Sequence, residues 1–395
     1  MRLPNLLFFS IYIIFTLILS ADPSQNQKSF GLWVPCQSEN ATLSSIKKID
    51  EMLVLAHEIK ITDLYVQVYR ENKSWFNSSI VDDVPFEDFY KKENRDLFQY
   101  IIQEAHKKNM KVHAWMNIFR VGKNPQASIL RKYGTDIITR DNLNRSMKDY
   151  PEFKLPLPHS KYFIYGEDGC WLDPGDLRVH QYYIDLIQEL LNKYPGIDGV
   201  HFDFFRYPYT VPFGPGSKWN KGIEFGYGIE SVKRFKSKYQ LDPFTMEKNE
   251  ENCQLWDNWR RDQITDVLKK SKKIISKMNS KVQLSVAVLC WSERAYQSSF
   301  QDWKRWLEEG LVHHVAVMNY TQDYRFFRYL AQSAVSARSN SKVRMGIGLY
   351  LLEKKPDLAL KEIQYIQTLA ADGVVLFAFE ALKNNPLWIE QFKKL

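Results

Sequence analysis

The sequence predicts an α/β chain that folds as a (β/α)8 TIM barrel, and three observations lead to this prediction. The chain has 395 residues, of which 45% are hydrophobic and 25% are charged, a composition typical of a globular protein with a large core. Short apolar runs rich in β-forming residues alternate with helix-like stretches along the whole chain. Two connections, about 120–170 and 209–258, are much longer than the others, as is common for loops at the carboxyl end of a barrel.

The apolar runs predict eight strands, and the segments between them predict helices. In "RDLFQYIIQEAHKKN", for example, Leu97, Ile101 and Ala105 recur at helical spacing. Strands that alternate with helices in this way favour a closed parallel barrel over two separate domains. The predicted strands cover residues 31–35, 63–69, 111–117, 198–203, 282–289, 314–320, 343–350 and 373–379.

The N-terminus has the pattern of a secretory signal peptide. Arg2 precedes an apolar run from Leu6 to Leu19, and the small residues Ser20 and Ala21 follow. A membrane span needs roughly 20 apolar residues, so an uncleaved anchor is the weaker alternative. We therefore expect a signal peptide over 1–21, the barrel domain over 30–395, and a secreted or periplasmic protein with no stable membrane span after signal removal.

The cysteines and the charge exclude several classes of protein. The four cysteines form no CxxC pair or Cys/His cluster, so no metal and no cofactor are expected, and the thiols either form disulfides or remain as buried free groups. The net charge of +8 comes from Lys and Arg spread along predicted helices without a nucleic-acid-binding motif, so no nucleic-acid partner is expected.

One helix start is especially clear in the segment "WLDPGDLRVHQYYIDLIQELLNKY". Here the sequence predicts Asp173 as the N-cap, Pro174 at the first helical position and Asp176 in the first turn. Capping explains these acids without any chemistry. Calcium binding and catalysis remain the alternatives.

Several long segments resemble one family in the same order along the chain. They include "VQVYRENKSWFNS", "LFQYIIQEAHKKNMKVHAWMNIFRV", "GVHFDFFRYP" and "QDWKRWLEEGLVHHVAVMNYTQD". From about Gly31 to Ala381 the chain resembles glycosyl-hydrolase-like family 10, which includes divisome-localised glycosyl hydrolases. The resemblance implies a TIM-barrel glycoside hydrolase, with bacterial cell-wall glycan a substrate of some relatives.

Asp203 is the first candidate for a catalytic carboxylate. Alternation in "HFDFF" points His201 and Asp203 to the same side of the fourth strand, and Asp203 lies at its carboxyl end, where barrel enzymes place their chemistry. Glycoside hydrolysis uses one carboxylate as nucleophile or base and a second carboxyl group as the acid. The alternative role for Asp203 is an ion pair with Arg206 that fixes the loop.

The second acid has three candidates near the same predicted edge. Asp323 in "MNYTQD" ranks first, because the resemblance supports the Tyr-Thr-x-Asp pattern, and Glu293 in "CWSER" and Glu380 after the eighth strand follow. The sequence leaves both the retaining and the inverting outcome open.

Other polar and aromatic residues near strand ends are candidates for binding sugar hydroxyls, an acidic substituent or pyranose faces. Several of them have the alternative of an ordinary core position, the two histidines above all. The function expected from all these features is hydrolysis of a polysaccharide or oligosaccharide, and the alternative is a catalytically silent glycan-binding barrel of the cell envelope. The candidates are Arg70, His113, Trp115, Asn117, Arg120, His201, Arg206, Tyr207, Trp291, Asn319 and Tyr320.

Overall fold

The structure is a computed structural model of the chain, and it describes residues 28–151, 168–209, 223–348, 355–383 and 386–392. The expected signal peptide over 1–21 lies outside the described residues, and so does most of the Gly-rich and aromatic loop of residues 211–228.

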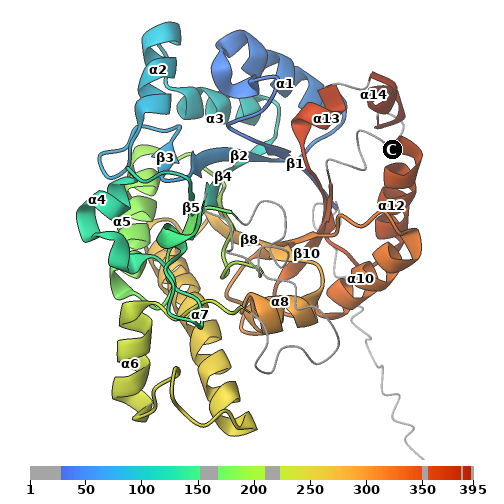
Figure 1. Cartoon of the computed structure of the whole chain (residues 1–395). Coiled ribbons are helices and arrows are strands. Elements are labelled where there is room, and N and C mark those ends of the chain that lie inside the picture. Colours follow the sequence, from blue (N-terminus) through green and yellow to red (C-terminus); the bar gives the residue numbers. More distant parts are fainter. Residues whose placement is uncertain (1–27, 152–167, 210–222, 349–354, 384–385, 393–395) are drawn as a thin grey trace, which may run out of the picture.

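Eight parallel strands form a closed barrel (Figure 1), which confirms the predicted fold class. Each strand pairs with the next along the chain, and the last pairs with the first, so the sheet has no open edge. All eight predicted strands are present, with ends that differ by a few residues. They are β1 (Ser29–Val34), β2 (Asp63–Arg70), β4 (Lys111–Asn117), β7 (Gly199–Asp203), β8 (Gln283–Leu289), β9 (His314–Met318), β10 (Lys342–Ile347) and β11 (Gly373–Leu376).

Helices surround the barrel, and shorter elements decorate its carboxyl end. The larger helices are α1 (Ile46–Glu58), α2 (Val84–Glu93), α3 (Leu97–Lys107), α5 (Leu177–Lys193), α6 (Ile229–Tyr239), α7 (Glu250–Met278), α10 (Tyr324–Ser336) and α12 (Pro356–Thr368). The shorter helices are α4 (Ser128–Tyr133), α8 (Ser292–Ser298), α9 (Trp303–Glu308), α13 (Phe379–Lys383) and α14 (Pro386–Phe392). Three further short strands are β3 (Lys73–Ser74), β5 (Arg120–Gly122) and β6 (Cys170–Trp171).

Strand β4 shows how the sequence builds the two faces of the barrel wall. Val112, Ala114 and Met116 belong to the main hydrophobic core between strands and helices. His113 and Trp115 alternate with them and point into the barrel, where Trp115 joins a second apolar cluster. Both faces of the strand are buried. The face towards the helices is apolar, and the face towards the barrel interior carries the polar group of His113.

The start of α5 differs from the prediction. Asp176, not Asp173, is the N-cap, and its carboxylate accepts a hydrogen bond from the backbone N–H of Arg178. Asp173 is buried in the preceding loop, where it accepts from Thr139 Oγ1 and the backbone N–H of Gly228. Burial raises the pKa of Asp173 to about 6 in spite of these hydrogen bonds. Asp173 therefore holds three separate loop segments together instead of starting the helix.

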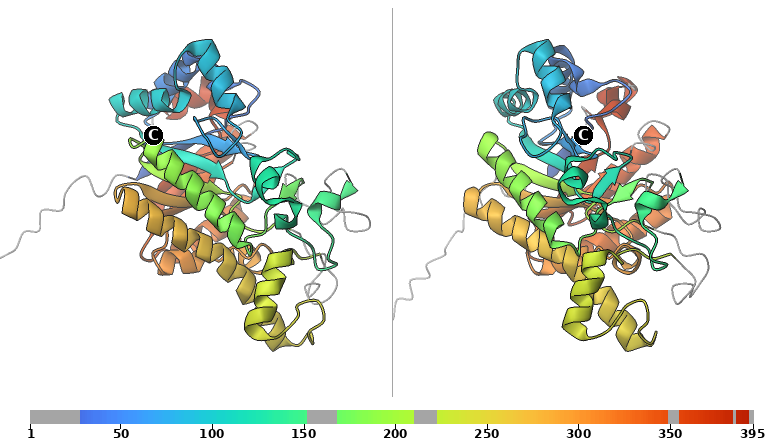
Figure 2. Two further views of the ribbon diagram at one scale, coloured as in Figure 1. Left: turned by 90° about the vertical axis from the view of Figure 1, so that its left-hand side faces the viewer. Right: turned by 60° about the vertical axis from the view of Figure 1, so that its left-hand side comes forward.

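The long connection between β7 and β8 forms a helical lobe that projects from the barrel (Figure 2). Phe235 of α6 and Tyr227, which lies just before α6, pack against Trp256 and Trp259 in the first half of α7, and the four form a hydrophobic cluster separate from the barrel core. Both helices continue the chain that leaves the carboxyl end of β7, so the lobe is an extended βα loop of the kind that the sequence predicted.

All four cysteines are free thiols in the structure. Cys36 and Cys170 are buried, and Cys253 and Cys290 are half-buried. Of the two alternatives, the structure therefore shows free thiols. Among the helices of the described segments, none combines the length and the apolar character that crossing a membrane requires.

Candidate active site

Asp203 lies at the mouth of the barrel, at the carboxyl end of β7 and in register with Asn117 of β4. Its Oδ2 accepts a hydrogen bond from Trp115 Nε1 at 3.2 Å, and its Oδ1 accepts one from the backbone N–H of Phe204 at 2.7 Å. Phe204 has a φ of 50°, so the chain turns sharply after the strand. The two N–H donors fix the orientation of a carboxylate that is only half-buried.

Aromatic rings line the mouth beside Asp203. Phe377 contacts Trp33 and Trp115 edge-on at centroid distances of 5.8 and 6.2 Å, and the Tyr320 ring stacks on it at 5.8 Å. Burial among these groups and the nearby charge of Asp203 raise the pKa of Tyr320 well above its usual value, although 36% of the residue surface is exposed. Tyr320 therefore keeps its hydroxyl protonated.

A second set of polar groups fixes Asn117 at the same level of the barrel. Asn117 Oδ1 accepts from Gln67 Nε2 at 3.1 Å, and Gln67 Oε1 accepts from the backbone N–H and the thiol of Cys36. Burial raises the pKa of the Cys36 thiol despite the nearby Arg70, so the group stays protonated and acts as a donor. The sequence analysis missed Gln67 and Cys36, because neither belongs to a motif.

Charged side chains of both signs form part of the rim. Arg120 donates to Glu71 Oε1 at 3.1 Å and to the backbone carbonyl of Asp168 at 3.0 Å, and its guanidinium lies over the Phe204 ring next to Asp203. Arg70 lies farther from Glu71, with an N to O distance of 3.9 Å. The two predicted arginines thus meet on one side of the mouth, held by a glutamate that the sequence analysis did not single out.

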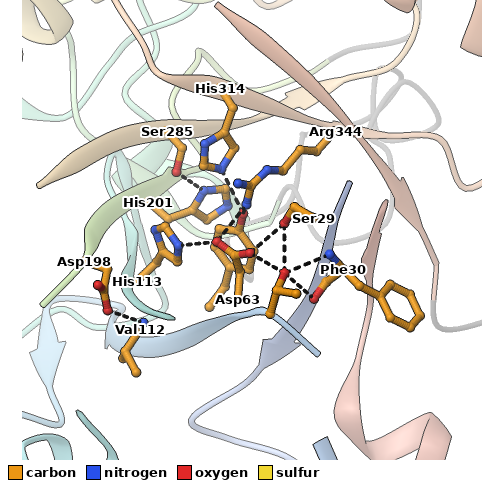
Figure 3. Close-up of polar contacts among 12 residues, drawn as sticks. Ser29, Phe30, Asp63, Val112, His113, Asp198, His201, Ser285, His314 and Arg344 are labelled. Carbon is orange, nitrogen blue, oxygen red and sulfur yellow. Dashed lines mark hydrogen bonds and ion pairs between the residues drawn. The ribbon is translucent and has the colours of Figure 1, made fainter. Parts of the chain in front are cut away.

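Below the mouth, a buried polar layer fills the barrel (Figure 3). Asp63 Oδ1 lies 2.9 Å from His113 Nε2 and 3.1 Å from Arg344 Nη1, and His201 and His314 gather around the same groups. Burial opposes ionisation of Asp63, but Arg344 and His113 outweigh it and hold its pKa well below the usual range. These groups pair with one another inside the protein.

His113 and His201 belong to this layer and occupy the core position that the sequence analysis gave as their alternative. Both are fully buried, and His201 is held by Trp33 Nε1 at 3.2 Å and by Ser285 Oγ at 2.9 Å. Burial lowers the pKa of His201 well below its usual value, so the ring stays neutral. Both histidines precede the strand ends and therefore lie deeper in the barrel than Asp203.

Three other residues that were predicted to bind substrate contact neighbouring parts of the protein instead. Tyr207 is fully buried and packs edge-on against Phe300, and Asn319 donates to the backbone carbonyl of Phe327 at the start of α10. The guanidinium of Arg206 lies over the Trp171 ring at 5.1 Å. The same guanidinium lies 5.4 Å from the centre of the Phe204 ring, so Arg206 packs against two aromatic rings.

Asp323, the preferred second acid, is the N-cap of α10. Its Oδ1 accepts from the backbone N–H groups of Arg325 and Phe326 at 2.9 and 3.1 Å, and the residue is exposed. Both capping bonds use Oδ1, and Oδ2 takes no part in them. The structure therefore gives Asp323 a structural role, as the cap of α10.

The other two candidates also have partners. Glu293 is exposed on α8 and lies 3.3 Å from Lys304, whereas Glu380 is buried and accepts from Ser38 Oγ at 2.7 Å and from Thr42 Oγ1. Neither interaction involves a residue of the mouth. Within the described segments, no group of three or more His, Cys, Asp or Glu side chains is placed to hold a metal ion.

The fold resembles that of several solved glycosidases. The catalytic domain of β-amylase from Paenibacillus polymyxa superimposes with a TM-score of 0.54 at 12% identity, over 90% of this chain and 93% of that one. A β-galactosidase from Bacillus circulans gives a TM-score of 0.55 at 14% identity, over 89% and 50%. At this identity the likeness concerns the fold alone.

Curated relatives and a family match identify the chain more closely. It is 25% identical over 277 residues to glycosyl hydrolase DigH of Escherichia coli K12, covering 65% of this chain and 54% of the relative. It is 23% identical over 323 residues to glycosyl hydrolase YngK of Bacillus subtilis, covering 75% and 55%. The chain thus spans about half the length of these relatives. Residues 29–362 match the family described as glycosyl hydrolase-like 10, and the chain belongs to this family.

Proposed function

We propose that the chain is a glycoside hydrolase that cleaves O-glycosidic bonds in a polysaccharide. The observation that carries the proposal is the Asp203 carboxylate, which is held by two N–H donors at the carboxyl end of a barrel strand and faces an aromatic mouth. The names of the relatives, glycosyl hydrolases DigH and YngK, support the same class of reaction.

In this proposal Asp203 acts as the nucleophile or as the base that activates a water molecule. A fixed carboxylate next to the reacting carbon stabilises the positive charge of an oxocarbenium-like transition state. The protonated hydroxyl of Tyr320 and the aromatic rings beside it hold the sugar, the first by hydrogen bonding and the others by contact with its apolar face. Asp323 ranks first and Glu293 second as the acid that protonates the leaving oxygen.

The proposed location and substrate rest on patterns in the sequence. The N-terminal pattern around Arg2 and Ala21 supports export to the periplasm or the medium. A protein in that compartment meets the cell-wall glycan, which the family resemblance also favours. Peptide-free cell-wall glycan is therefore the first polymer to test.

A second candidate function is glycan binding without turnover. The observation that favours it is that each candidate acid already has a structural partner: the N-terminus of α10 for Asp323, Lys304 for Glu293, and Ser38 with Thr42 for Glu380. A barrel in which none of these groups protonates a leaving oxygen would hold sugar at the same mouth.

The test compares the wild type with Asp203→Asn on peptide-free cell-wall glycan and on chitin oligosaccharides. We expect release of reducing ends by the wild type and a loss on the order of a thousandfold in the variant, because the charge that stabilises the transition state is removed. Melting temperature and glycan binding, measured by affinity electrophoresis, should stay close to wild type. The hydrolase proposal would be falsified if the variant kept its turnover within about threefold of wild type. Binding without turnover by the wild type would establish the second candidate.

A further inference from the structure

Three aromatic side chains form an exposed ledge next to the mouth. Phe326 and Tyr329 stack with ring centroids 6.3 Å apart and planes inclined by 11°, and Trp291 meets Phe326 edge-on at 5.5 Å. Trp291 directly precedes α8, and the other two lie on the first turns of α10. Trp291, Phe326 and Tyr329 are called the aromatic ledge below.

The aromatic ledge continues the lining of the proposed active site. Trp291 follows Cys290 at the carboxyl end of β8, and Tyr320 follows β9. Leu289 and Met318 are register partners on the paired strands β8 and β9, so Trp291 and Tyr320, each two residues further along, leave the mouth at neighbouring positions. Figure 1 shows α8 and α10 next to each other beside strands β8 and β10. A chain of sugars that leaves the mouth past Tyr320 would therefore reach Trp291 and then Phe326 and Tyr329.

The exposure of the ledge is unusual for aromatic side chains. Tyr329 has 63% of its surface exposed, the largest fraction among the exposed large hydrophobic residues that the structure describes. Phe326 and Trp291 are half-buried, so the ledge is anchored in the fold and rises to the surface. Apolar rings that lie together on a surface mark a binding site more often than isolated ones do.

The polar groups around the ledge point to the kind of ligand. The guanidinium of Arg294 lies 3.9 Å from the centre of the Trp291 ring, and no carboxylate pairs with Arg294 in the described segments. A flat apolar surface with hydrogen-bond donors at its side suits a pyranose ring, which has apolar C–H faces and a rim of hydroxyl groups.

We propose that the aromatic ledge is an outer sugar-binding subsite, which stacks against a pyranose ring of the same glycan whose scissile bond lies at Asp203. The proposal rests on the proposed function and extends it. A subsite beyond the reacting bond makes the enzyme prefer long glycan chains to short ones, because each additional stacked sugar adds binding energy.

The test measures how Tyr329→Ala changes the preference for chain length. The substrates are the disaccharide and the hexasaccharide of β-1,4-linked N-acetylglucosamine, together with peptide-free cell-wall glycan. We expect the ratio of kcat/KM for the long substrate to that for the short one to fall about three- to tenfold, the range that loss of one aromatic stacking contact gives. Tyr329→Phe keeps the ring and should restore the ratio.

Tyr90→Ala is a matched control at an exposed tyrosine of α2 that does not belong to the aromatic ledge. Tyr90 is 48% exposed and stacks on Phe86 of the same helix, α2, at 5.9 Å, so it reproduces the local situation of Tyr329 away from the ledge. This variant should keep the length preference of the wild type. Equal ratios in Tyr329→Ala, Tyr90→Ala and wild type would overturn the proposal.

A binding measurement distinguishes a failure of the ledge proposal from a failure of the proposed hydrolase function. With Asp203→Asn as background, the hexasaccharide should bind more weakly when Tyr329→Ala is added, and this result would support the ledge even if the wild type cleaved no glycan. Unchanged hexasaccharide binding would contradict the ledge while leaving hydrolysis at Asp203 intact. A wild-type dimer that Tyr329→Ala converts to a monomer, seen by light scattering, would assign the ledge to self-association and overturn the sugar subsite.

Discussion

The indole of Trp115 holds the Asp203 carboxylate from inside the barrel. Trp115 Nε1 donates to Asp203 Oδ2, and the ring packs against Trp33 and Phe377, so it can hardly move. We predict that Trp115→Phe, which keeps an aromatic ring and removes the donor, lowers kcat about ten- to a hundredfold, because a hydrogen bond to a charged group contributes about 1.5 to 3 kcal/mol.

Steady-state kinetics and a thermal melt check this prediction together. The melting temperature of Trp115→Phe should change little, because the smaller ring still fills most of the apolar cluster. If kcat stayed at the wild-type value, the hydrogen bond from Trp115 Nε1 would not be needed to orient Asp203.

Asp323 can be tested as an acid without disturbing its role as a cap. Asn is as good an N-cap as Asp, so Asp323→Asn should keep the stability of α10 while removing the proton donor. We predict that the variant loses activity on natural glycans and recovers much of it on an aryl glycoside with an activated leaving group, since protonation then matters less. Equal rates of variant and wild type on both substrates would reduce Asp323 to a cap.

The sequence predicts some site residues well and others poorly, for one physical reason. Asp203, Asn117 and Tyr320 were found because they lie at or just after strand ends, which the apolar runs define. Alternation along a strand tells which face a side chain takes but not how deep it lies, so His113 and His201 were grouped with the mouth although they lie inside the barrel.

At the scale of elements, local patterns predict the strands well and contacts between distant segments poorly. The eight barrel strands are short apolar runs whose outward residues pack on helices, a pattern that the sequence carries by itself. The start of α5 was misplaced because Asp173 is bound by Thr139 and Gly228, which are far away in the sequence. No local rule for N-caps contains these partners.

Helix α12 carries a buried acid whose carboxyl group forms no hydrogen bond within the described segments. Glu362 is fully buried, and in the described part of the chain neither carboxyl oxygen has a hydrogen-bond partner. Burial raises the pKa of Glu362 to about 8. The native state therefore keeps a proton that the unfolded chain, with a glutamate pKa of about 4.3, releases at lower pH, so the contribution of Glu362 to the free energy of unfolding falls as the pH rises from about 4 to 8.

We predict that Glu362→Gln is more stable than the wild type at neutral pH. The amide has a similar shape and no charge, so it removes the cost of deprotonating a buried group. Urea unfolding at about pH 5 and about pH 8 measures this, and the advantage of the variant should grow towards the higher pH. An advantage that did not depend on pH would show that the Glu362 side chain reaches water when it ionises.

At the scale of the whole molecule, the described fold begins after the expected signal peptide. Strand β1 starts at Ser29 and closes the barrel against β11, and Lys28 Nζ bonds to the carbonyls of Gln367 and Leu369 at the end of α12. Removal of residues 1–21 would leave these contacts in place. We predict that the exported chain begins near Ala21 or Asp22, which mass spectrometry of the N-terminal peptide would show. Intact Met1 on protein recovered from the cytosol would contradict export.

The buried histidines should make the whole barrel sensitive to mild acid. Burial lowers the pKa of His201 and of His314 well below the usual value, and nearby Arg344 lowers both further. Burial also lowers the pKa of His180 to about 4, although its bond to the Pro174 carbonyl opposes this shift. In the unfolded chain all three titrate near 6.5. Below that pH the unfolded state binds protons that the native state does not, so the free energy of unfolding decreases as the pH falls.

We predict that the protein loses stability between about pH 6.5 and about pH 4, with each buried histidine contributing up to about 1.4 kcal/mol per pH unit. Asp63 does not account for this loss, because its lowered pKa confines its contribution to lower pH, where it would itself become protonated. Urea unfolding across this range measures the slope. His180→Gln keeps a donor for the Pro174 carbonyl and cannot take up a proton, so it should make the slope shallower by about one proton. A free energy of unfolding that stayed constant from neutral pH down to about pH 5 would mean that the buried histidines become protonated without unfolding the barrel.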